Sequence, residues 1–391
     1  MGLMNEYTSK RWGPNELLKE LNQLIKKYNG FRKTYLLVYA AAVEKPIPDS
    51  ALCMDDCYVI RDLLSEKNSK ELDFYIETPG GRGDAAEEIV RFTREKFERV
   101  NFVISGEAKS AGTVLALSGD EILMTNSGSL GPIDAQLKIG RSTVSAHDYL
   151  EWVDSKREEA ERMGKLNPFD AVIVAQISPG ELNHVFHAQK FSEDLVKDWL
   201  PKYKFKNWVT TEKRGIEVTP EMRQERANEI ALELLNHARW RSHGRSIKIS
   251  DLESIGLQVV TIDKDPELAD IVYRMQTLIR LLFLNTTIYK IIATDSDNVI
   301  RQAVSTGEAP KLPPNLLANA LTVEAKCQKC GEVHKIYAKL DPDPDIDKQF
   351  AEKGFDPYPK TDKLMCECGY EIDLSGFRNE MEARTGKKFI I

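Results

Sequence analysis

The chain has 391 residues, which is long enough for one large domain and a second, smaller one. Its 42% hydrophobic and 29% charged residues are those of an ordinary globular protein, and the formal net charge of −7 argues against non-specific nucleic-acid binding as its main activity. No run of about 18 apolar residues predicts a transmembrane helix. Residues 1–6 lack the basic start and apolar core of a secretory signal, so we expect a cytoplasmic protein without membrane attachment.

The first third of the chain alternates between predicted strands and helices. Apolar residues at helical spacing predict a helix over residues 14–28, and a short apolar run predicts a buried strand over 35–40. The further elements expected in this part are a helix over 50–66, which carries Cys53 and Cys57 as buried side chains, strands over 72–78 and 100–105, and a helix over 85–98. This alternation predicts a parallel sheet with right-handed crossovers.

Two turns at the ends of these strands have the composition of a catalytic site. The first contains Gly80 and Gly81, whose backbone N–H groups are open to an anionic oxygen because no side chain covers them. The second places Ser110 among small residues at the start of a helix. A serine in that position is often only a helix cap. A glycine-rich loop after one strand and a serine turn after the next together favour a nucleophile beside oxyanion donors.

Three motifs in fixed order carry a family resemblance. They are Thr78-Pro79-Gly80-Gly81, Gly106-x-Ala108-x-Ser110-Ala111-Gly112 and Gly131-Pro132-Ile133-Asp134. Together they resemble Clp/crotonase-type serine peptidases, and within these the SppA-like serine dehydrogenase proteinase family. The resemblance extends more loosely over about residues 15–300. Family members have a second proline where this chain has Ala135. The resemblance implies an α/β fold built as a repeated β-α-β superhelix.

The resemblance also implies site residues. Ser110 is the expected nucleophile, and the expected oxyanion donors are the backbone N–H groups of Ala111 and of the loop of Gly80 and Gly81, with Gly81 preferred. The identity of the general base is left open by the sequence, because the histidine that Clp proteases carry downstream of the serine has no counterpart at residues 132–135.

Lysine and histidine compete for the role of base. The SppA-like branch uses a lysine whose pKa is lowered by burial. We favour Lys190, which the helical pattern places on the inner side of its helix, over Lys138, Lys156 and Lys165. His243, just before the family's closing element, is either the base or a structural histidine. Asp134 is expected to orient the base or to cap a turn, and Lys109 is expected to lie in solvent.

The rest of the first domain is read as mostly helical. Helices are expected over 148–163, 179–200 and 220–240, with residues 199–208 as a basic, aromatic surface loop or short arm. Residues 268–304 are expected to form a long apolar helical region that either joins subunits or covers the sheet. The predicted domains are therefore a peptidase domain over 1–264, a helical extension over 265–304, a linker over 305–320 and a small module over 321–391.

The small module contains two cysteine pairs on tight turns. Cys327 and Cys330 are followed by a glycine, as are Cys366 and Cys368, although the second pair has one intervening residue instead of the usual two. Two such cysteine turns can bind a Zn²⁺ ion with tetrahedral geometry. A module with a small apolar core needs an additional stabilising element such as a bound metal. We predict a zinc-ribbon-like domain with about one structural zinc per chain.

Three functions compete at this point. The favoured one is a cytoplasmic serine peptidase that acts on polypeptides and is controlled by homo-oligomer assembly or by a regulatory protein partner. Acyl-CoA chemistry on the crotonase fold is disfavoured by the serine in the second turn and by the lack of an obvious acidic pair. The remaining alternative is a catalytically silent Clp-like scaffold whose zinc module recruits protein or nucleic acid, with protein favoured by the acidic sequence around the module.

Overall fold

The chain divides into two units, Met1–Ala303 and Val304–Ile391, each of which is described by itself. The computed structural model describes residues 2–45, 47–139, 142–211, 215–303, 320–327, 329–385 and 388–390. The linker predicted over 305–320 lies outside these ranges except for its last residue. None of the helices within the described ranges is long and apolar enough to cross a membrane.

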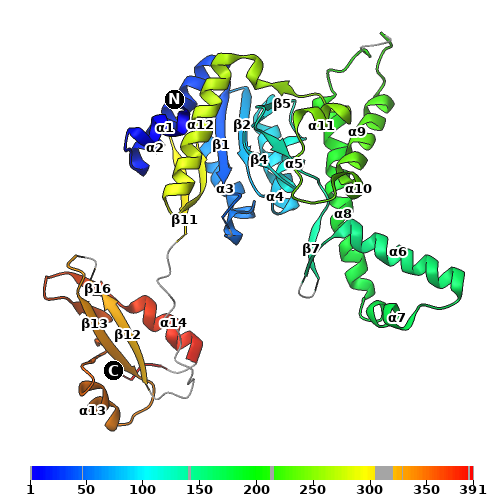
Figure 1. The fold of residues 1–391 in the computed structure, drawn as a ribbon. Coiled ribbons are helices and arrows are strands. Elements are labelled where there is room, and N and C mark those ends of the chain that lie inside the picture. Colours follow the sequence, from blue (N-terminus) through cyan, green and yellow to red (C-terminus); the bar gives the residue numbers. More distant parts are fainter. Residues whose placement is uncertain are drawn as a thin grey trace. The chain divides into compact units, whose positions relative to one another are not determined.

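A seven-stranded sheet with the order β11-β10-β1-β2-β3-β5-β9 forms the centre of the first unit (Figure 1). Five neighbouring strands are parallel, as the sequence predicts, and β10 and β11 extend the sheet antiparallel beyond β1. The strands are β1 Tyr35–Ala41, β2 Glu71–Glu77, β3 Arg99–Ile104, β5 Glu121–Met124, β9 Val260–Thr261, β10 Ile288–Ala293 and β11 Asn298–Gln302.

Helices cover both faces of this sheet (Figure 1). Successive strand side chains point to opposite faces, so Leu37 of β1 packs on one helical layer and Leu36 on the other. The layer around Leu37 includes α3 Met54–Leu64, α4 Gly83–Lys96 and α5 Ala111–Ala116. The layer around Leu36 is built from α1 Leu3–Ser9, α2 Pro14–Arg32 and α12 Pro266–Asn285. The result is a three-layer α/β unit with an apolar core on each side.

The predicted helical region over 268–304 is wrong in its second half. α12 ends at Asn285, and the chain returns as strands β10 and β11 of the sheet. The apolar face of α12 packs against α2 and the sheet. This packing agrees with the prediction that the segment covers the sheet of its own chain. Its use in joining subunits stays a prediction.

A helical region follows the short segment β6 Ser129–Leu130 (Figure 1). The residues predicted to form a surface loop or short arm, 199–208, instead continue α8 as a π-helical turn, Leu200–Lys204, and bury Trp199, Leu200 and Phe205. The elements of this region are the hairpin of β7 Gln136–Ile139 and β8 Ser142–Ser145, followed by α6 Ala146–Met163, α7 Pro168–Val174, α8 Pro179–Trp199, α9 Pro220–Leu235, α10 His237–Trp240 and α11 Ile249–Ser254.

The second unit is a small β-rich fold with its own core around Ile336 and Tyr358. A three-stranded sheet, in the order β12-β13-β14, is accompanied by the hairpin of β15 and β16. The elements are β12 Ala320–Lys326, β13 Val333–Lys339, α13 Asp345–Ala351, β14 Asp356–Pro357, β15 Lys363–Met365, β16 Glu371–Asp373 and α14 Ser375–Thr385.

Candidate active site

Ser110 lies between the two-residue strand β4 (Glu107–Ala108) and α5 in a backbone conformation that serine rarely adopts. Its φ is +50° and its ψ is −117°. Although the residue occupies the N-cap position, its side chain makes no capping hydrogen bond with α5. The hydroxyl is therefore not used to terminate the helix, as it would be in an ordinary serine cap. An unusual backbone held at the end of a sheet is a common feature of functional sites.

The loop after β2 runs directly against this serine. A Cβ added to Gly80 would lie 2.7 Å from Cβ of Ser110 and 3.4 Å from its Oγ, so only glycine allows this approach. Gly80 has φ +112° and Gly81 φ +147°, both in the region that favours glycine. The two sequence-predicted turns are thus in contact, and the strands β2 and β3 that carry them are neighbours.

The three predicted oxyanion donors differ in availability. The N–H of Gly80 donates to Oγ1 of Thr78 at 3.2 Å, so Gly80 as an oxyanion donor is not supported. The N–H groups of Gly81 and Ala111 make no hydrogen bond to any of the residues that the structure describes. Unpaired backbone N–H groups next to a nucleophile can stabilise a developing oxyanion, and Gly81 and Ala111 directly follow the two residues, Gly80 and Ser110, that are in contact.

Asp134 and His243 form a close pair. Nδ1 of His243 lies 2.8 Å from Oδ1 of Asp134, whose side chain is 1% exposed. Burial would raise the pKa of the Asp134 carboxyl, but hydrogen bonds from His243, Ser145 and Gln136 hold it below its usual value. An ionised carboxylate at Nδ1 fixes the histidine tautomer that leaves Nε2 as a proton acceptor.

Lys109 connects the chain segments that carry these residues. It is 5% exposed, so the prediction that it lies in solvent is wrong. Its Nζ donates to Oγ of Ser246 at 2.9 Å, and to the carbonyl oxygens of Arg245 at 3.2 Å and Leu130 at 3.4 Å. Burial lowers the pKa of Lys109. The residue next to Ser110 therefore ties the segments leading to Asp134 and to His243 onto the serine turn.

None of the four lysines that the sequence offered as bases is buried. The prediction that Lys190 is buried on its helix is wrong, because its side chain is 54% exposed and pairs with Asp194 at 3.7 Å. Lys138 and Lys165 are exposed, and Lys156 pairs with Glu159 and Asp170. None of these four lies in the buried surroundings that a lysine base requires.

The four cysteines of the second unit converge. Their Sγ atoms lie within 4.8 Å of one another, with Cys327 and Cys368 at 3.5 Å and Cys330 and Cys366 at 3.5 Å. A Zn²⁺ bound about 2.3 Å from each sulfur would separate the sulfurs by roughly 3.8 Å, so the cluster fits such an ion. Each of the two cysteine turns ends in a glycine with positive φ, which is +82° at Gly331 and +77° at Gly369.

Part of the chain is similar to known proteins. Residues 46–215 match the family described as ClpP-like SDH-type serine proteinase. Two proteins of Methanocaldococcus jannaschii, MJ0137 and MJ1495, both described as uncharacterized, are each 26% identical over 204 and 203 residues, which is 52% of this chain. The matched part covers 58% of the first and 56% of the second, so the chain spans a little over half of each relative.

One solved structure, described as a membrane-bound stomatin-specific protease, is 14% identical to this chain. The match covers 56% of this chain and 79% of that one, and its TM-score is 0.32.

Proposed function

We propose that the chain is a serine peptidase with Ser110 as its nucleophile, because residues 46–215 match the family described as ClpP-like SDH-type serine proteinase. The observation that carries the proposal is the contact between the uncapped Ser110 turn and the glycine loop. The hydroxyl attacks a peptide carbonyl, and the N–H groups of Gly81 and Ala111 receive the developing oxyanion. The substrate class is polypeptide.

We assign the base to His243 and its orientation to Asp134. Nε2 of His243 takes the proton of the Ser110 hydroxyl and returns it to the leaving amine, while the carboxylate at Nδ1 stabilises the imidazolium. The 2.8 Å contact between His243 and Asp134 supports this choice over Lys190, whose ammonium is exposed. A lysine base requires burial, and the Lys190 side chain is exposed.

The test is covalent labelling with a fluorophosphonate, followed by peptide hydrolysis. The wild-type chain should label at Ser110, and Ser110→Ala should abolish labelling while keeping the circular-dichroism spectrum. His243→Gln and Asp134→Asn should slow labelling by about 10²–10⁴-fold, the usual effect of losing a general base or its partner. Lys190→Ala serves as the matched control and should label at the wild-type rate.

Two outcomes would contradict this proposal. A wild-type chain that never labels would favour the catalytically silent scaffold. If Lys190→Ala loses labelling while His243→Gln keeps it, the base is the lysine. We retain the cytoplasmic location, the homo-oligomer and the regulatory protein partner as parts of the proposal. Light scattering of the purified chain tests the homo-oligomer directly.

We propose further that the cysteine cluster holds a structural Zn²⁺. Four thiolates leave no open coordination position, so the ion would stabilise the fold of the second unit and take no part in hydrolysis. The residues that would hold it are Cys327, Cys330, Cys366 and Cys368. Elemental analysis should find about one zinc per chain.

A further inference from the structure

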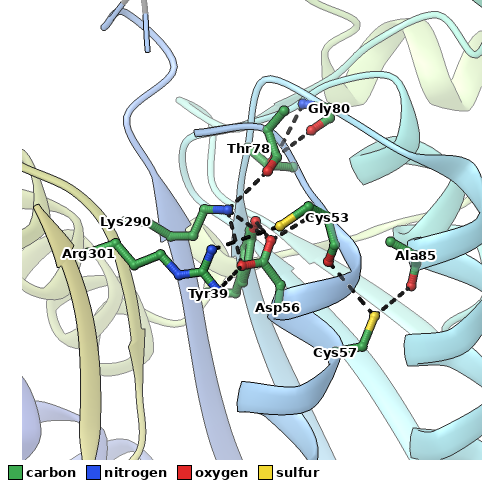
Figure 2. Close-up of polar contacts among 10 residues, drawn as sticks. Tyr39, Cys53, Asp56, Cys57, Thr78, Gly80, Ala85, Lys290 and Arg301 are labelled. Carbon is green, nitrogen blue, oxygen red and sulfur yellow. Dashed lines mark hydrogen bonds and ion pairs between the residues drawn. The ribbon is translucent and has the colours of Figure 1, made fainter. Parts of the chain in front are cut away.

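A fully buried ion pair lies near the glycine loop (Figure 2). Lys290, on β10, and Asp56, on α3, are each 0% exposed, and Nζ of Lys290 is 2.8 Å from Oδ2 of Asp56. The Tyr39 hydroxyl donates to the same carboxylate at 2.9 Å, and the Arg301 guanidinium lies 3.4 Å from it. We call these four residues the Lys290–Asp56 cluster. Burying two charges is costly, and an apolar pair of similar size is often as stable.

The cluster binds the backbone on both sides of Leu52. Nζ of Lys290 donates to the carbonyl oxygen of Ala51 at 2.9 Å. The N–H of Cys53 donates to Oδ2 of Asp56 at 3.0 Å. These directional bonds, which an apolar pair could not make, fix the peptide groups before and after Leu52.

Leu52 in turn holds the glycine loop. Its N–H donates to the carbonyl oxygen of Gly80 at 2.7 Å, and its carbonyl oxygen accepts from the N–H of Arg82 at 3.0 Å. The backbones approach so closely that a Cβ on Gly81 would lie 2.3 Å from the Leu52 oxygen. The orientation of the Gly81 peptide therefore depends directly on where the Leu52 backbone is held.

We propose that the Lys290–Asp56 cluster is a positioning device that sets the oxyanion loop of the peptidase. The inference rests on the proposed function, and it places a residue from outside the family-matched segment 46–215 in control of that loop. Lys290 and Asp56 do not touch substrate in this scheme; they act through Leu52 on the Gly81 N–H. Their loss should change the rate of the chemical step more than substrate binding.

The decisive variant is the double substitution Lys290→Met with Asp56→Leu. Lys290→Met alone leaves Asp56 with only the more exposed Arg301 as its counter-charge, and Asp56→Leu alone leaves the buried Lys290 without one. Each single substitution should therefore strongly lower the unfolding free energy. The double variant removes both charges, so stability should recover in part, but Ala51 and Cys53 remain without their partners. We expect its fluorophosphonate labelling rate and kcat to fall by about 10- to 100-fold, the cost of roughly 1 Å of misplacement, with KM little changed.

A matched control lies at the other end of β2. Asp73 is also 0% exposed and accepts from a tyrosine, Tyr28 at 2.7 Å, and from an arginine, Arg32 at 3.1 Å. Asp73→Asn should lower stability without slowing the labelling of the folded protein. If the double variant does not fold, Asp56→Asn takes its place, labelled at a temperature at which its circular-dichroism spectrum equals that of the wild type.

The outcomes separate the two proposals. Slow labelling by a folded double variant, together with normal labelling by Asp73→Asn, supports the positioning role. A folded double variant that labels as fast as the wild type overturns the positioning role alone. A wild-type chain that does not label overturns the proposed function and this inference with it.

Discussion

Ser110 sits where glycine would be the natural residue. At φ +50° and ψ −117°, a side chain costs about 1–3 kcal/mol of backbone strain. We predict that Ser110→Gly is more stable than Ser110→Ala by about 1 kcal/mol, although glycine lowers stability at most positions. Denaturant unfolding of the two inactive variants measures the difference. If alanine is the more stable replacement, the turn is relaxed and its shape has no energetic cost.

Glu77, the last residue of β2, predicts a pH dependence of stability. It is 0% exposed, and burial raises its pKa to about 7 despite Arg280 at 2.7 Å. Its folded-state pKa exceeds the ordinary value of 4.5, so the folded state binds the proton more tightly. The resulting stabilisation is complete below about pH 4.5 and is lost as the pH rises through 7, by about 3 kcal/mol.

Glu77→Gln isolates this effect. The difference in unfolding free energy between the variant and the wild type should move in favour of the variant between pH 4.5 and 8. Denaturant titrations at several pH values supply the measurement. A difference that stays constant over this range would show that the pKa of Glu77 is the same in the folded and unfolded chain.

Sequence reasoning singled out the two turns of the candidate site, which the structure brings into contact, but it did not predict which lysines are buried. Glycine and serine at strand ends have local backbone requirements, so Gly80, Gly81 and Ser110 could be singled out from the sequence alone. Whether Lys109 or Lys190 is buried depends on segments that lie far away along the chain. Lys109 is covered by residues 245–246, and Lys190 is left uncovered on α8. No local pattern carries that information.

At the scale of elements, Lys109 joins three segments, and its removal should loosen all of them. Lys109→Met keeps the aliphatic volume but leaves the Ser246 hydroxyl and the carbonyl oxygens of Arg245 and Leu130 without their donor. We predict a loss of about 1–3 kcal/mol in unfolding free energy and slower fluorophosphonate labelling. Lys138→Met, at an exposed position of β7, is the control and should change neither quantity. Unchanged labelling of Lys109→Met would mean that the three segments hold together without this residue.

The alternation of strand and helix predicted the parallel part of the sheet correctly, but it missed the antiparallel edge. Ile288–Ala293 is a short apolar run directly after an apolar helix, and such a run suits a buried strand as well as a helix. Its pairing partner, β1, is more than 240 residues earlier in the chain, as Val38 opposite Ala293 shows. A strand whose identity comes from so distant a partner cannot be recognised from its own residues.

For the molecule as a whole, metal removal should affect one unit only. All five tryptophans, residues 12, 152, 199, 208 and 240, belong to the first unit, so their fluorescence reports that unit alone. A strong chelator should make the second unit sensitive to protease while the tryptophan emission stays constant, because that unit has only a small apolar core and would depend on the metal for its stability. Added Zn²⁺ should restore resistance. An unchanged digestion pattern in chelator would contradict a structural metal.

The position of Lys290 in the chain has a consequence for biosynthesis. A ribosome delivers the Ser110 turn long before it delivers Lys290, which is 180 residues further on. Until that lysine arrives, Asp56 lacks its fully buried counter-charge and β1 lacks its neighbour β10. Under the positioning role proposed for Lys290, a nascent chain carries its nucleophile without a set oxyanion loop. The order of the sequence would then delay proteolytic competence until the first unit is almost fully translated.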